Sequence, residues 1–206
     1  ATTGRGGAIS LAVGSGNSGV GGSMSMRAGQ ASADGATGGS AYITGGTSMT
    51  AGVGGAVVAC GGSSSSGTGG LIDIQSGRGL TSSSGAVLVL TANGGSTGIS
   101  GRLVFSSGTS KLGNSGVLLL GSGHATAGRA GGISITVGSG TSGTGGELAL
   151  HSGRSVLATG GFIVMASGEG TQTSSGAIRI TTLNSGAAGT SGVLSFSSGS
   201  ASDGNT

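Results

Sequence analysis

The sequence of 206 residues contains no proline and no tryptophan, a single cysteine, and few charged (6%) or aromatic (2%) residues. The lone Cys60 excludes an internal disulfide. The net charge of +3 is a small difference between eight basic and five acidic residues, so it does not indicate a nucleic-acid-binding surface. No apolar run approaches the ~18 residues of a membrane span. Disordered chains are usually rich in charge and proline, and this chain is rich in neither.

Residues that carry chemistry are scarce and do not cluster. The five acidic residues form no pair, and the two histidines, His124 and His151, lie far apart in the sequence. A metal site or a nucleophile with its base would need such groups to converge. No Gly-Lys-Ser/Thr follows the glycine-rich runs, which excludes a phosphate-binding loop of that type. We therefore expect no enzyme activity, no cofactor and no metal.

What the sequence does contain is a repeat built on glycine, which accounts for 53 residues. An anchor glycine precedes each short apolar word, such as Ile-Ser-Ile at 133–135, and recurs at a nearly constant spacing. The anchors divide the chain into thirteen rows, and a residue's column is its distance along the chain after its anchor. The anchors are Gly7, Gly22, Gly39, Gly55, Gly70, Gly85, Gly101, Gly116, Gly131, Gly146, Gly161, Gly176 and Gly192.

Columns two and four are apolar in every row, although only 34% of the chain is apolar. Ile133 and Ile135 occupy them in one row, with Ser134 between. This alternation predicts a β-strand with one buried face in each row, so that the side chains of these two columns form the core. Column seven is glycine in 11 of 13 rows, which indicates either a bend with positive φ or a close approach of the backbone.

A short strand is stable only when it stacks on its neighbours, as in repeat proteins. We therefore expect an all-β fold, a single-domain β-solenoid over 1–206, with about 13 coils of 15–16 residues and a thin two-sheet cross-section. Gly4, Arg5 and Gly6 fit the last three columns of a preceding row, and Gly204 fits a glycine column of a following one. The solenoid is thus predicted to be uncapped at both ends, which favours end-to-end stacking of copies.

Columns one, three and five are predicted to face outward from this solenoid, and Ser134 is typical of them. Several rows instead carry apolar residues there, which predicts an exposed apolar strip for lateral contact with another copy or layer. A second layer buried by the chain's own segments is the alternative. The predicted lateral interface consists of Val58, Leu71, Leu88, Leu90, Val104, Val117, Leu119, Phe162 and Val164.

The words "GGELALHSG" at 145–153 and "GSGTSGTGG" at 138–146 resemble the Gly/Ser/Thr-rich repeats of extracellular fibre and surface proteins from algae and related protists. The resemblance covers the whole chain through one short, degenerate word. It implies an extracellular or cell-surface structural role, and it carries over no functional residues.

These observations predict an extracellular structural protein that assembles into a fibre or filament by coil stacking and lateral apolar contacts. Its partners would be copies of itself, end to end and side by side, with glycans as a further candidate, and with no nucleic acid and no membrane span. One alternative is an adhesin or surface-binding stalk. Another is an ice-binding protein, suggested by the Thr, Val or Ile that stands two residues before the next anchor in 8 of 12 rows. It is less favoured because an ice-binding face would need two regular Thr columns.

Overall fold

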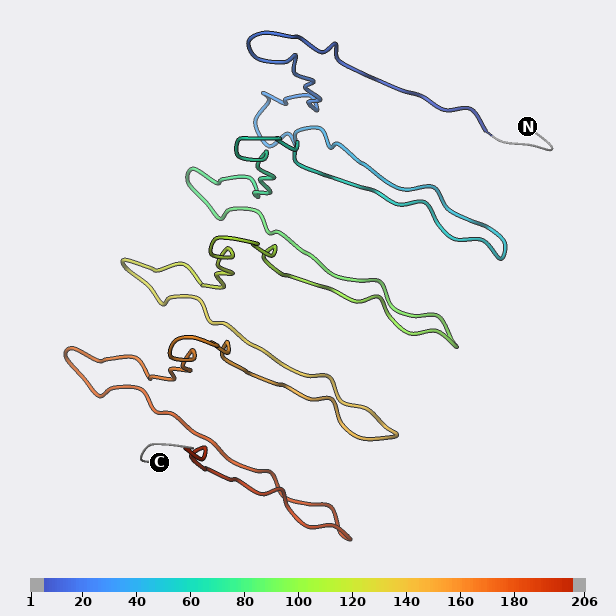
Figure 1. Ribbon diagram of the computed structural model, residues 1–206. Coiled ribbons are helices and arrows are strands. Elements are labelled where there is room, and N and C mark those ends of the chain that lie inside the picture. The colour runs from blue at the N-terminus through green and yellow to red at the C-terminus, as the bar shows by residue number, and fades with distance from the viewer. Residues whose placement is uncertain (1–5, 202–206) are drawn as a thin grey trace. The chain divides into compact units, whose positions relative to one another are not determined.

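The computed structural model describes residues 6–201, and it contains no helix and no β-strand among them (Figure 1). The described part of the chain accordingly has no helix that is long and apolar enough to cross a membrane. The predicted β-solenoid, with its thirteen stacked coils and two sheets, is therefore wrong. Gly4, Arg5 and Gly204, which were assigned to incomplete rows, lie outside the described residues.

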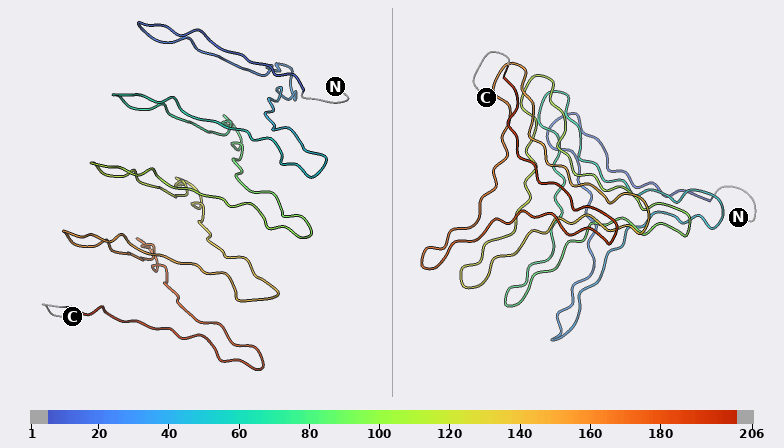
Figure 2. Two further views of the ribbon diagram at one scale, coloured as in Figure 1. Left: turned by 45° about the vertical axis from the view of Figure 1, so that its right-hand side comes forward. Right: turned by 90° about the horizontal axis from the view of Figure 1, so that it is seen from below.

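The repeat inferred from the sequence is present as a period of bends. Each of the first twelve rows bends once, within columns ten to thirteen, and the chain doubles back there as a narrow loop (Figures 1 and 2). The chain divides into two units, Ala1–Val104 and Phe105–Thr206. The expectation of a single domain stays a prediction. The first unit bends at 17–19, 33–35, 49–52, 65–67, 80–82 and 96–97, and the second at 111–113, 126–128, 141–144, 156–158, 171–173 and 187–189.

Each loop closes where an anchor glycine returns to columns six and seven of the row before it. A Cβ atom added to any anchor from Gly22 to Gly192 would lie within 4 Å of one of these two residues. In Gly55 and Gly70 it would lie 2.9 Å from the backbone nitrogens of Gly46 and Gly62, closer than real Cβ atoms approach. We call this contact the glycine clasp. At Gly55 and Gly70 the clasp requires glycine, because two backbones meet there. The column-seven glycines show neither predicted feature, since none has a positive φ and a Cβ atom on any of them would meet nothing within 4 Å.

In six of the twelve clasps a backbone hydrogen bond completes the closure. The anchor N–H donates to the carbonyl of the column-seven glycine in the preceding row, as from Gly70 to Gly62 at 2.8 Å. The five others join Gly39 to Gly29, Gly55 to Gly46, Gly85 to Gly77, Gly161 to Gly153 and Gly176 to Gly168. The two bonded glycines are 8, 9 or 10 residues apart, so the hydrogen bond forms across loops of different lengths.

Column nine precedes the bend and is often serine or glycine. The hydroxyl oxygens of Ser64, Ser110 and Ser155 each accept a hydrogen bond from the N–H three residues later, at 2.8 to 3.1 Å. Serine favours turns because its side chain satisfies a backbone group that the turn leaves free. Among the described residues positive φ occurs within bends, at Gly19, Gly35 and Gly143, and not in column seven where the sequence pattern suggested it.

The described residues include no buried side chain, so the apolar residues of columns two and four do not form a core. The whole chain exposes 20442 Å². A folded monomer of 18.6 kDa would expose about 8,200 Å² and its unfolded chain about 27,000 Å². One chain therefore hides only about a third of the surface that a folded monomer of its mass would hide.

The solenoid prediction was wrong because the alternation of apolar and polar residues defines the two sides of a segment but does not show that a second segment lies beside it. A strand requires a hydrogen-bonded ladder with a second segment. Every backbone–backbone hydrogen bond of the described residues is local, within a loop or across a clasp. The straight segments of columns one to five take part in none of them. The β-branched residues before the anchors, such as Val20 and Ile99, are likewise exposed and lie in no strand.

Candidate interaction surface

The predicted lateral interface lies entirely on the straight segments between a clasp and the next bend. Leu71, Val117 and Phe162 are in column one, and Leu90 is in column five. The remaining five, Val58, Leu88, Val104, Leu119 and Val164, are in column three. All nine side chains are exposed. The structure therefore leaves this surface open, and the lateral contact itself stays a prediction.

The columns of the straight segments are unequally exposed. From Met24 onward, the large apolar residues of column two are 49–59% exposed. Those of columns one and three are 62–88% exposed. Column two is thus more shielded than columns one and three, although it is far from buried, whereas the large apolar residues of column four, predicted on the same side, are 47–81% exposed. Each segment consequently presents apolar groups for which one chain provides incomplete cover.

Asp73 and Gln75 show that alternate residues of a segment lie on the same side. The Gln75 amide nitrogen, Nε2, donates hydrogen bonds to both carboxylate oxygens of Asp73, at 2.9 and 2.7 Å. Side chains two residues apart meet in this way when the backbone is extended. Columns three and five of this row are therefore polar, whereas in the row of Gly85 they carry Leu88 and Leu90.

Some segments are apolar on both sides. The sequence Val87-Leu88-Val89-Leu90 and the sequence Val117-Leu118-Leu119-Leu120 carry no polar side chain at four consecutive positions. All eight of these residues are exposed. In proteins such runs are typical of segments covered on both faces. A single neighbour on one side would still leave half of their apolar surface in water.

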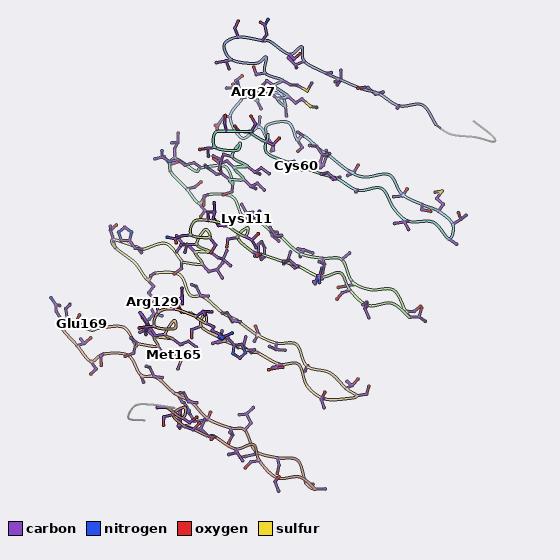
Figure 3. All side chains as sticks on the ribbon, viewed as in Figure 1. Arg27, Cys60, Lys111, Arg129, Met165 and Glu169 are labelled. Atoms are coloured by element: carbon purple, nitrogen blue, oxygen red, sulfur yellow. The ribbon has the colours of Figure 1, made fainter. Side chains whose placement is uncertain are left out.

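The described residues contain no arrangement that suggests catalysis or metal binding. They form no cavity. No group of three or more His, Cys, Asp or Glu residues that could hold a metal ion occurs among them. Cys60 is a free, exposed thiol in column five. Figure 3 labels Arg27, Lys111, Arg129 and Glu169, which belong to four different rows.

The sequence reasoning missed the role of column six, the residue under the clasp. The signal was present, because column six is Gly, Ala, Ser, Thr or Val in every row. Among the described residues the few that are partly shielded lie in columns six and nine: Ala28, Gly45, Gly79, Thr91 and Gly170. Three residues under a clasp, Ala28, Gly45 and Thr91, thus have more cover than any residue of the apolar columns, which the sequence pattern did not predict.

No protein-family model, curated protein or solved structure shows significant similarity to this chain.

Proposed function

We propose that this protein is a structural protein that acts as an assembly of its own copies, an extracellular fibre or filament. In this proposal the clasped loops are small spacers that set the repeat. The straight segments provide the contacts between copies. Its extracellular location is inferred from the resemblance of its repeat words to those of algal surface proteins.

The observation that carries the proposal is the exposed area. At 20442 Å², one chain exposes about 12,000 Å² more than a folded monomer of its mass. Fixing the backbone of each residue costs about 1–2 kcal/mol, which burial of apolar surface has to offset. Because the chain keeps its apolar columns in phase over thirteen rows without burying them, the missing burial is expected to come from other copies.

The composition supports association of identical chains. Charged residues are 6% of the sequence, so the repulsion between like copies is small. Leu88, Leu90, Leu119 and Phe162 are each 71–85% exposed, and exposed apolar side chains that recur in this way are candidates for an interface. The repeat provides equivalent contact sites along the chain, which favours growth of long assemblies over a closed pair.

Electron microscopy and sedimentation velocity of the purified chain over a wide concentration range test the proposal. We expect filaments whose sedimenting fraction rises with concentration, because each copy covers its neighbours. A single slow species at all concentrations, with no filaments, would contradict it. If that species bound glycans, the adhesin alternative would be favoured, and thermal hysteresis of its solutions would favour ice binding.

A further inference from the structure

The straight segments lack hydrogen-bond partners as well as apolar cover. The described residues make ten backbone–backbone hydrogen bonds, whereas a folded protein of this length makes roughly 130. None of the ten uses an N–H or C=O group of columns one to five. These columns comprise about a third of the chain and contain about three quarters of its bulky apolar residues. The same residues therefore need both apolar cover and backbone partners.

This double requirement restricts what can cover the segments. A purely apolar cover, such as lipid or a smooth hydrophobic surface, would bury the Leu88 and Leu119 side chains but leave the adjacent N–H and C=O groups unpaired. Burying an unpaired backbone group costs about 1–3 kcal/mol. An extended polypeptide supplies both kinds of contact, because it presents a row of donors and acceptors together with alternating side chains.

The area shows how far along the chain this polypeptide must extend. A standard protein interface buries about 800 Å² on each partner. The excess exposure of this chain, about 12,000 Å², is roughly fifteen times larger. One local contact cannot remove it. The partner has to follow the chain through most of its rows, with a short extended segment and room for a small loop in each row.

A second copy of the same chain meets this description. Its apolar segments have the same length and the same spacing, and the segments between them are small bends closed on themselves by glycine clasps. Electrostatic repulsion between the segments of two copies is small, because columns one to five of all thirteen rows contain only five charged residues: Arg27, Asp73, Arg102, Glu147 and Arg179.

We propose that columns one to five of each row pair with columns one to five of another copy, in a register of whole rows. Backbone hydrogen bonds that one chain does not make within itself then form between chains. A shift of one residue would turn the apolar side of a segment away from its counterpart. Larger shifts would place the straight segments of one copy beside the bends and clasps of the other, which are not extended. This inference rests on the proposed function, and it adds the partner, the contacting columns and their register.

Photo-crosslinking between isotopically distinct copies tests the register. Phe196, in column four, is replaced by p-benzoylphenylalanine, which changes an exposed aromatic residue into a larger one. Chains in ¹⁴N and ¹⁵N are made separately, mixed in denaturant, assembled and irradiated. The same probe in place of Phe162, in column one, gives a second reading if the first variant assembles poorly. The control replaces Leu157, which lies in the bend at 156–158.

We expect mixed-isotope crosslinks from position 196 or 162 to fall in columns one to five of the other copy. Random contact would place only about a third of them there. The control at position 157 should crosslink outside these columns. Filaments whose column-four probe reacts mainly with bends, or only within its own chain, would overturn the inference and leave the proposed function standing. Absence of any assembly from the unmodified chain would overturn both.

Discussion

At the scale of single residues, no clasp with a β-branched side chain in column six has the closing hydrogen bond, although the two clasps with Ser107 and Ser122 lack it as well. The four β-branched residues are Val13, Thr91, Val137 and Thr182. All six bonded clasps have Gly, Ala or Ser at that place. A Cβ added to Gly146 would overlap Cγ1 of Val137, which shows how the branched side chain occupies the space under the anchor. Loop length does not explain the difference, because loops of the same length occur in both groups.

Shortening Val137 should therefore close its clasp. In Val137→Ala we expect a new hydrogen bond from the Gly146 N–H to the Gly138 carbonyl, and its amide hydrogen should exchange several-fold more slowly, as measured by NMR. The reverse change, Ser152→Val, should open the bonded clasp between Gly161 and Gly153, which is 2.8 Å long. Branched side chains are stiff at χ1 and cannot easily rotate away. Unchanged exchange in both variants would show that column six is not the determinant.

Gly61 and Gly62 are adjacent glycines with opposite tolerance for a side chain. A Cβ on Gly61 would overlap the carbonyl of Gly70, whereas a Cβ on Gly62 meets nothing within 4 Å. Neither has a positive φ. The backbones of this clasp lie closer together than those of the bonded clasps with Ala28 or Ser76 in column six. We therefore expect Gly61→Ala to disrupt it and weaken assembly by about 1–3 kcal/mol, the usual cost of overpacking. Gly62→Ala should leave it intact or gain about 0.4–1 kcal/mol. The urea midpoint of filament dissociation compares the two, and an equal loss in both would contradict the clasp geometry.

At the scale of elements, the sequence determines the period and the sides of each segment but not its pairing. Thirteen phased rows predicted where the chain repeats, and each of the first twelve has one bend inside its clasped loop, as at 65–67 between Gly62 and Gly70. The alternation of Ile133, Ser134 and Ile135 predicted two unlike sides, but on the predicted inner side only column two is consistently less exposed. An alternating pattern does not determine which other segment a strand would pair with, so the predicted sheets and core did not follow from it. The open apolar surface, in contrast, could be read directly from column three.

Two residues of column three provide a matched test of this surface. Leu119 is apolar and Ser134, one row later, is polar at the same place. Leu119→Asn should lower the association constant about tenfold, because losing the burial of one leucine costs at least ~1.5 kcal/mol. Ser134→Asn should change it less than about twofold, since a polar side chain replaces another. Sedimentation of both variants at matched concentrations measures the difference, and equal effects would remove column three from the interface.

At the scale of the whole molecule, association should depend on apolar burial and hydrogen bonds rather than on charge. Charged residues are few and lie in scattered rows, so attraction between ion pairs contributes little. Raising NaCl from about 0.05 M to about 1 M shortens the Debye length from roughly 14 Å to 3 Å, yet the assembled fraction should change less than about threefold. Sulfate at equal ionic strength should increase it, because excluded salts strengthen apolar burial, and urea should dissolve it. Turbidity and sedimentation across the three solutes give the comparison. Filaments that dissolve in NaCl alone would require an electrostatic contact that the apolar segments do not provide.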